Sequence, residues 1–225
     1  MARGDTAVPV LDLEEHLITV PPGVPPDFGE DPPPPDPWPP AGPAVSNARL
    51  AMLVFLGAEA MFFAGLVGAF LVFRLGSVTW PPAGQPRLPV AVTGVNTVIL
   101  LLSAYTMHRA LRAIRAGSRQ GLAGGLLATA LLGAVFLGVQ GVEWVRLIHF
   151  GLTLSTGVYG ATFYTLIGVH GAHVLGALIW LSLVLVAARR ARFTTRTHVP
   201  VTLCGMFWFF VVFLWPVLYV LVYLR

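Results

Sequence analysis

Five long apolar runs dominate the sequence and restrict the chain to one class of fold. They cover about residues 50–73, 88–107, 121–143, 158–188 and 199–224. A run of about 20 apolar residues can cross the ~30 Å hydrocarbon core of a bilayer as a helix, whose backbone hydrogen bonds are satisfied internally. Only 11% of the residues are charged, whereas soluble domains have about a quarter. The sequence therefore predicts an all-α integral membrane bundle of five transmembrane helices.

The segment before these runs differs in composition from the rest of the chain. Eight of the ten acidic residues lie in it, and its second half is rich in proline. Proline removes backbone donors and fixes φ, so we expect a disordered, polyproline-II-like tail in the cytoplasm. An arm that docks a partner is the alternative. The chain thus divides into an acidic tail, residues 1–48, and a membrane domain, residues 49–225.

Arginine is distributed unequally between the two ends of the predicted helices. Ten Arg residues lie in the tail and in the connections between helices two and three and between helices four and five, against four on the opposite side. Because cytoplasmic segments carry the excess of positive charge, we expect the N-terminus in the cytoplasm and the C-terminus outside. Arginines clustered between apolar runs suit anionic lipid headgroups and not nucleic acid. The candidates for headgroup contacts are Arg109, Arg112, Arg189, Arg190 and Arg192.

A glutamate lies deep inside the first apolar run. At 1.5 Å per residue, Glu59 is about 14 Å from the cytoplasmic end of the run. A charge at that depth costs about 2.5–3.5 kcal/mol on insertion scales. Glu59 is therefore either a carboxyl that hydrogen-bonds a neighbouring helix or a proton-handling group, and the residue alone does not favour one of these interpretations.

Two histidines lie one helical turn apart on the fourth run. His170 and His173 share a helix face, but a bis-histidine haem needs ligands from opposite sides, and no further Cys, Asp or His lies at similar depth. We therefore expect no metal site and favour hydrogen bonding between helices. Because Glu59 lies at comparable depth, we hypothesise that it pairs with these histidines across the first and fourth helices.

Further polar side chains lie within the second and third runs. Asn96 is expected to cap or to hydrogen-bond across helices, while Gln140 and Glu143 lie at i and i+3 near the outer end of the third run. Glu143 is interpreted as an interfacial group paired with Arg146.

Small and aromatic residues suggest how the helices pack. Small residues repeat every fourth position at Ala60, Ala64 and Gly68 and again at Gly168, Ala172 and Gly176, a spacing that favours close helix approach. Most of the aromatic residues of the last run are expected to face lipid.

The polar motifs, taken in order, resemble one known family. The motifs are GAEAMFFAGL (57–66), VNTVILLLSAYTM (95–107), GVQGVEW (138–144) and FYTLIGVHGAHVLG (163–176), followed by the spaced aromatics of the last run. Over about residues 49–225 they resemble subunit III of the haem–copper respiratory oxidases, in its five-helix bacterial form. The family commonly has His and Asp where this chain has Phe209 and Val212, so this chain departs from the family pattern at that polar pair.

The resemblance implies a non-catalytic subunit of a proton-pumping cytochrome c oxidase in the inner membrane of a bacterium. Haems and copper would lie in partner subunits, with subunit I as the main contact and subunit II beside it. Structural phospholipid would bind in a cleft between helices one and two on one side and helices three to five on the other. The subunit would support proton uptake and turnover stability, and it could contact other respiratory complexes.

Other functions are compatible with the same residues. Within the family, the chain could serve a quinol oxidase or act as an accessory subunit of a nitric oxide reductase. A small proton channel using Glu59 and His173 would belong to a different class, as would a haem-binding anchor.

Overall fold

The computed structural model describes residues 46–82 and 88–224, which form five α-helices and no strand. The helices are α1 (Asn47–Leu75), α2 (Val90–Arg115), α3 (Arg119–His149), α4 (Val158–Arg189) and α5 (Val199–Tyr223). All five are long and apolar enough to cross a membrane. The predicted all-α, five-helix membrane fold is therefore confirmed. The predicted disordered tail falls on residues 1–45, outside the described part, apart from its last residues at the start of α1.

Two helices continue well beyond their apolar runs. The sequence predicts that the second helix ends near Met107 and the third near Glu143, but α2 reaches Arg115 and α3 reaches His149. The extensions keep buried residues on one face, such as Ile114 in α2, and arginine is a good helix former. The end of an apolar run therefore shows where a helix leaves the hydrocarbon core, whereas the helix continues for several more residues.

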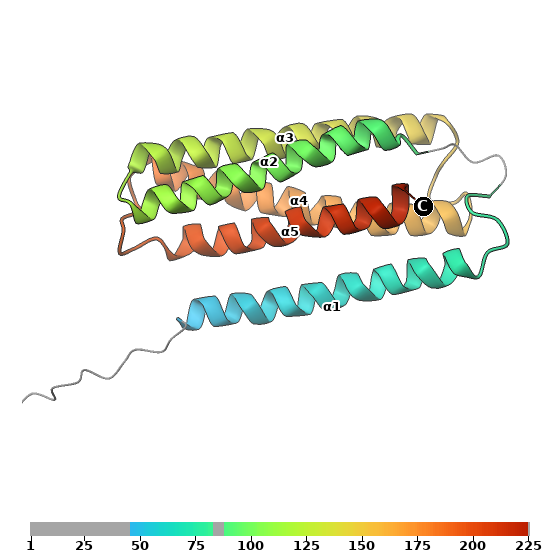
Figure 1. The fold of residues 1–225 in the computed structure, drawn as a ribbon, viewed down its shortest axis with the longest axis horizontal. Coiled ribbons are helices and arrows are strands. Elements are labelled where there is room, and N and C mark those ends of the chain that lie inside the picture. The colour runs from blue at the N-terminus through green and yellow to red at the C-terminus, as the bar shows by residue number, and fades with distance from the viewer. Residues whose placement is uncertain (1–45, 83–87, 225) are drawn as a thin grey trace, which may run out of the picture. The chain divides into compact units, whose positions relative to one another are not determined.

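The helices run side by side with connections at alternating ends, as Figure 1 shows. Helix α2 packs on α3 and α5, α4 packs on α3 and α5, and α1 contacts only α4 and α5. Within the described residues, no Cα atom of α1 comes within 8 Å of α2. The expected pairing of helices one and two as a separate group is therefore wrong, because α5 contacts both and lies between them.

The closest helix approach occurs between α2 and α3. A Cβ atom added at Gly125 would lie 2.8 Å from the Cβ of Ala110, and one added at Gly121 would lie 2.9 Å from the Cβ of Ala113. Glycine thus lets these two backbones approach each other. The small-residue repeats that the sequence predicts for close helix approach are largely exposed instead. Ala60, Ala64 and Gly68 are exposed on α1, as are Ala172 and Gly176 on α4.

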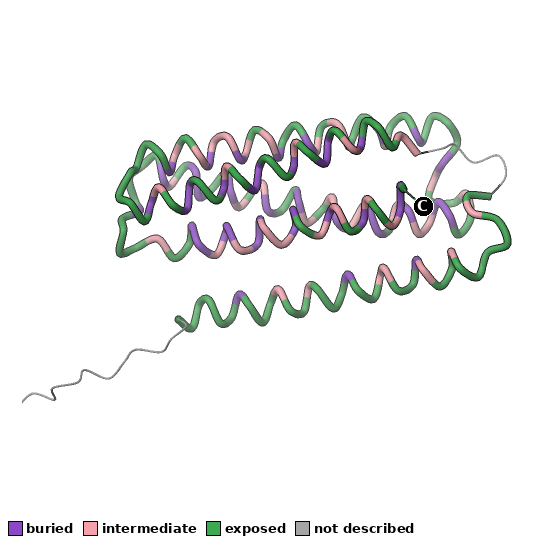
Figure 2. The backbone as a smooth tube through the Cα atoms, in the orientation of Figure 1, coloured by how far each residue is buried: buried purple, intermediate pink, exposed green. Residues whose placement is uncertain are grey.

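The tryptophans of α5 face the interior. Trp208 and Trp215 are fully buried and donate their indole N–H groups to Ser103 Oγ (3.1 Å) and Thr97 Oγ1 (2.9 Å) of α2. The prediction that the aromatics of this helix face lipid is wrong for these residues, because an indole N–H in hydrocarbon would lack an acceptor. Figure 2 shows the result: buried positions recur along α5, whereas α1 is mostly exposed.

Candidate functional site

An acid–imidazole pair joins α1 to α4 near the middle of both helices. Glu59 Oε2 lies 3.1 Å from His173 Nε2. The side chains are 18% and 22% exposed, respectively. Phe62 and Phe63 flank the imidazole with ring centroids at 6.3 Å and 5.1 Å. The pairing hypothesised from the sequence is therefore present for His173.

The contacts of His173 indicate where its protons lie. Its Nδ1 is 2.7 Å from the backbone oxygen of Val169, and because a carbonyl oxygen only accepts, we assign a hydrogen to Nδ1. Nε2 then either accepts a hydrogen bond from a protonated Glu59 or, in an imidazolium, donates one to the carboxylate. In both cases the carboxyl has a polar partner inside the membrane, which lowers the cost of placing it there.

His170 does not join this pair. Its ring stacks on Trp215 of α5, with centroids 5.1 Å apart and an interplanar angle of 25°. The side chain is fully buried, and neither ring nitrogen has a hydrogen-bond partner among the described residues. The expectation of hydrogen bonding between helices is therefore wrong for His170. One feature of the sequence could have indicated that Trp215 packs in the interior. It lies seven residues after Trp208, which puts both indoles on one helix face.

The histidines do not fit a haem or a metal centre. They project from one helix, and His170 packs on an aromatic ring while His173 turns toward α1. Across residues 46–82 and 88–224, no three His, Cys, Asp or Glu side chains gather closely enough to hold a metal ion. A structural metal site usually has four such ligands.

Asn96 and Gln140 link α3 to its neighbours. Asn96 is buried on α2 and donates from Nδ2 to the Phe136 oxygen of α3 at 3.0 Å. Gln140 of α3 donates from Nε2 to the Tyr223 hydroxyl of α5 at 3.2 Å. Both contacts satisfy buried donors between helices, while Oδ1 of Asn96 has no partner among the described residues. Tyr223 was not singled out by any sequence pattern, and its position at the end of an apolar run gives no signal for this contact.

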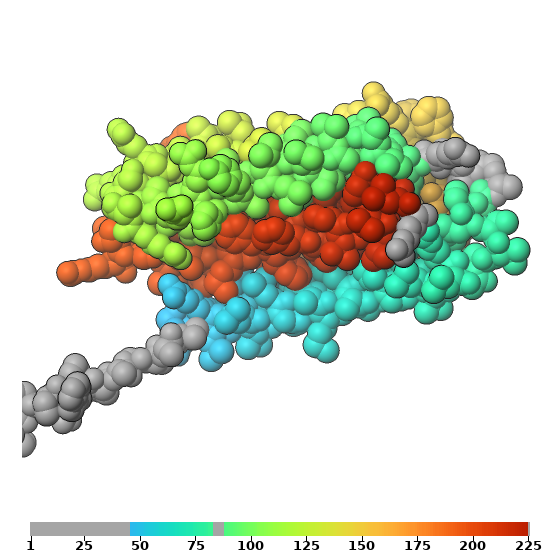
Figure 3. Space-filling view, viewed as in Figure 1, coloured from blue at the N-terminus to red at the C-terminus, as the bar shows by residue number. Residues whose placement is uncertain are grey.

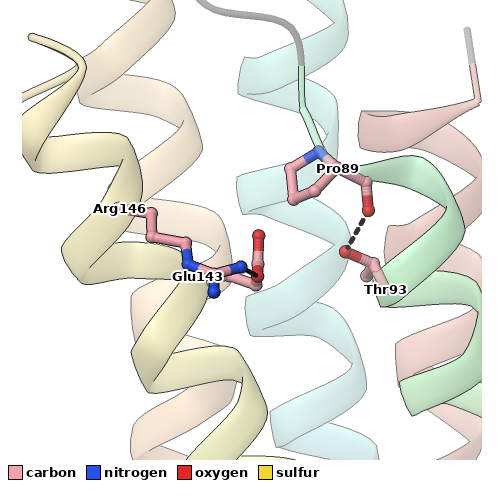
Figure 4. Close-up of polar contacts among 4 residues, drawn as sticks. All are labelled: Pro89, Thr93, Glu143 and Arg146. Atoms are coloured by element: carbon pink, nitrogen blue, oxygen red, sulfur yellow. Dashed lines mark hydrogen bonds and ion pairs between the residues drawn. The ribbon is translucent and has the colours of Figure 1, made fainter.

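Glu143 forms an ion pair within α3. Its Oε1 lies 2.9 Å from Arg146 Nη1, and the Glu143 side chain is 7% exposed while that of Arg146 is 62% exposed. Figure 4 shows this pair together with the Thr93 hydroxyl, which donates to the Pro89 oxygen in the first turn of α2. The pairing of Glu143 with Arg146 agrees with the sequence-based interpretation, but the carboxylate itself is buried.

Arginines gather at the end of the bundle where α1 begins, which we term the arginine-rich end. Within the described residues they are Arg49, Arg109, Arg112, Arg115, Arg119, Arg189, Arg190, Arg192 and Arg196. All are exposed, whereas Glu59 and Glu143, the acidic residues of the described part, lie near the middle of α1 and toward the opposite end of α3. These arginines therefore have no carboxylate partner in the described part of the chain.

Comparisons of the sequence with a family model and with known proteins agree on one family. The sequence model of the family described as cytochrome c oxidase subunit III matches residues 43–225. A cytochrome c oxidase subunit 3 from Synechocystis sp. is 36% identical over 174 residues, which are 77% of this chain and 73% of the relative. Another, from Thermostichus vulcanus, is 35% identical over 176 residues, covering 78% of this chain and 86% of the relative. The matched region includes all five helices and both members of the Glu59–His173 pair.

Proposed function

The chain belongs to the cytochrome c oxidase subunit III family, and from this membership we propose that it is the non-catalytic subunit III of a proton-pumping haem–copper terminal oxidase. As a multi-pass membrane protein it forms part of an oxidase complex of aerobic respiration. We place the haems and copper in partner subunits, because the two central histidines do not fit a redox centre.

The Glu59–His173 pair carries the proposal that this subunit supports proton uptake. Nε2 and Oε2, two atoms that can each bind a proton, lie 3.1 Å apart near the midpoints of α1 and α4. Gain or loss of a proton there changes the net charge of a site flanked by two phenylalanines. The pair is thus a proton reservoir that sustains turnover without taking part in oxygen reduction.

The outer face of α1 is the proposed contact with subunit I. Ala60, Ala64 and Gly68 are exposed there, and a Cβ added at Gly68 meets nothing within 4 Å. Figure 3 shows α1 along one edge of the bundle, with its outer side uncovered in this view. Small residues at four-residue spacing suit close packing of another transmembrane helix. In this proposal subunit I makes the main contact, and subunit II belongs to the same assembled complex.

The arginine-rich end supports the proposed orientation and lipid contacts. Because positive charge accumulates on the cytoplasmic side, we assign this end, and with it the start of α1, to the cytoplasm of a bacterial inner membrane. The C-terminus then lies outside. Arg109, Arg112, Arg189, Arg190 and Arg192 are exposed at this end and contact the headgroups of anionic lipids.

Purification of the tagged chain from its native membrane tests this function. In gentle detergent, the chain should co-purify with a haem-bearing subunit, and the preparation should show the visible absorption of haem and reduce oxygen. The same chain expressed alone should show no Soret absorption and bind no copper. Recovery of the chain without any haem-bearing partner, or iron or copper bound to the lone chain, would contradict the proposal.

A further inference from the structure

A groove lies between α3 and α4, about half-way along α4. Its volume is about 380 Å³, whereas a cavity of about 150 Å³ is enough for a benzene ring. Gly141 of α3 and Gly168 and Gly171 of α4 line it, and Gly141 is exposed at the outer surface of the bundle. The groove therefore has room for a ring and several further carbon atoms.

Trp144 of α3 forms one wall of the groove. A Cβ added at Gly168 or at Gly171 would lie 3.6 Å from Cη2 of Trp144. These glycines bring the α4 backbone close to the indole, and they add no side chain that would fill the space beside it. A flat aromatic wall facing a surface without side chains suits a flat ring, which can stack on the indole.

Two polar groups of α3 are available at this groove. Gln140 is 5% exposed and donates through Nε2 to the Tyr223 hydroxyl. Its Oε1 receives no hydrogen bond within the described part of the chain and remains for the groove that Gln140 lines. Nε1 of Trp144, one turn away on the same helix face, also has no partner among the described residues. Because buried polar groups require partners, the groove favours an occupant that can hydrogen-bond.

The depth of the groove restricts which amphiphiles can offer such a hydrogen bond. Helix α4 runs from Val158 to Arg189, so at 1.5 Å per residue Gly171 lies about 20 Å from one end and about 27 Å from the other. Phospholipid headgroups stay at the surface of the ~30 Å hydrocarbon core, and acyl chains carry no donor. An occupant with a donor at this depth must carry it on a body that is otherwise apolar.

We propose that this groove binds an isoprenoid hydroquinone, whose ring lies between Trp144 and the glycines of α4 and whose hydroxyl donates to Oε1 of Gln140. Such a molecule combines a flat ring and hydroxyl donors with a wholly apolar tail that extends into the membrane. The amide of Gln140 can also turn over, because the Tyr223 hydroxyl can donate as well as accept. The NH₂ group then faces the groove and bonds the carbonyl of the oxidised quinone. This inference goes beyond the proposed function and concerns binding alone.

Filling the groove tests its location. The purified complex is incubated in detergent with radiolabelled decylubiquinol, under argon and with cyanide, and the quinol bound per complex is counted after gel filtration. Gly141→Leu should abolish one binding site, because its Cβ meets no neighbouring helix within 4 Å and the leucine enters the groove. Gly124→Leu, on the same helix and equally unobstructed, should retain the site. Equal binding by both variants would overturn the proposal.

Removing the hydroxyl donors tests the hydrogen bond to Gln140. The dimethyl ether of decylubiquinol keeps the ring and the tail, and it should bind the unaltered complex about tenfold more weakly, as expected for the loss of one buried hydrogen bond. Gln140→Met should bind the quinol and the ether equally. Equal binding of both by the unaltered complex, or displacement of the quinol by excess phosphatidylcholine, would overturn the proposal. The haem absorption of each preparation reports complex formation separately, so failure of the proposed function can be recognised independently.

Discussion

At the scale of single residues, the Glu59–His173 contact shows how a bilayer interior accommodates a titratable group. Nδ1 of His173 is committed to the Val169 carbonyl, which leaves Nε2 to share one proton with Glu59. His170, one turn away, instead packs on Trp215. Two histidines on one helix therefore have different roles, set by which neighbouring helix each meets.

Replacing Glu59 by Gln should separate a supporting role from a catalytic one. The amide keeps the size of the side chain and can donate to Nε2 of His173, but it cannot exchange the shared proton. We expect the complex to assemble with a near-normal initial rate of oxygen reduction, a modest loss of proton uptake and fewer turnovers before inactivation. Oxygen consumption and proton release by reconstituted enzyme measure this, with Glu143→Gln as the control. Complete loss of oxygen reduction would contradict the supporting role.

A double-mutant cycle measures the strength of the contact. Glu59→Leu, which unlike Gln cannot hydrogen-bond Nε2, and His173→Phe, alone and combined, should show a coupling of about 1.5–3 kcal/mol in the free energy of unfolding in detergent, as expected for a hydrogen bond to a charged group. The matched cycle of Glu59 with His170 should give a coupling within about 0.5 kcal/mol of zero. Similar coupling in both cycles would show that the 3.1 Å contact is not specific.

At the scale of helices, glycine and tryptophan decide which helices pack together. Glycines on α3 allow the close approach to α2, and the buried indoles of α5 bond to Ser103 and Thr97 of α2. Helix α2 is thereby held on two sides by specific contacts. Helix α1 has fewer buried residues, among them Phe63 and Phe70, and contacts only α4 and α5.

Two adjacent glycines provide a test of the α2–α3 contact. Gly125→Ala should cost about 1–3 kcal/mol in the free energy of unfolding, because its Cβ would press on Ala110 and force the helices apart. Gly124→Ala should be neutral or stabilise by up to about 1 kcal/mol, since its Cβ is unobstructed and alanine favours helix. Denaturation in detergent micelles measures both. Equal effects would show that α2 and α3 are not in close contact here.

At the scale of the whole molecule, charge and exposed surface indicate how the bundle fits into a larger assembly. Nine exposed arginines lie at one end of the described bundle, while Arg74 and Arg146 belong to the other end. The small residues Ala60, Ala64 and Gly68 of α1, a helix that contacts only α4 and α5, are exposed. The bundle is therefore asymmetric both along the membrane normal and around its circumference.

Gly68→Leu should block assembly while leaving the fold of the subunit intact. Apart from the neighbouring backbone of α1 itself, no atom lies within 4 Å of the position where its Cβ would be, so leucine obstructs only a partner helix. We expect the variant to insert in the membrane but to lose the haem-bearing subunit on purification. Gly176→Leu on α4, also free of neighbours within 4 Å, serves as the control. Equal recovery of the complex with both variants would place the partner elsewhere.

Deletion of residues 1–40 should preserve membrane insertion and orientation. The arginine asymmetry that directs orientation lies in the remaining chain. A cysteine introduced at exposed Thr195 should react with a membrane-impermeant maleimide only from the cytoplasmic side, with and without the deletion. If the oxidase instead disappears from the membrane, the tail docks a partner.

The sequence by itself was sufficient to predict the number and type of helices in the described part of the chain and the contact of Glu59 with His173. The helices could be predicted because membrane insertion depends on hydropathy along the sequence. The contact could be predicted because a carboxyl in hydrocarbon requires a polar partner at its own depth in the membrane. The family resemblance read from the polar motifs was likewise confirmed by the comparisons.

Only the tertiary structure decided which face of each helix turns inward. In lipid, apolar residues are equally acceptable on both sides, so hydropathy gives no signal for helix partners. For this reason the small-residue repeat of α1 proved to be exposed, the tryptophans of α5 proved to be buried, and α1 and α2 proved to be separated by α5. Side-chain shape and hydrogen bonding select these arrangements, and both depend on residues far apart in the chain.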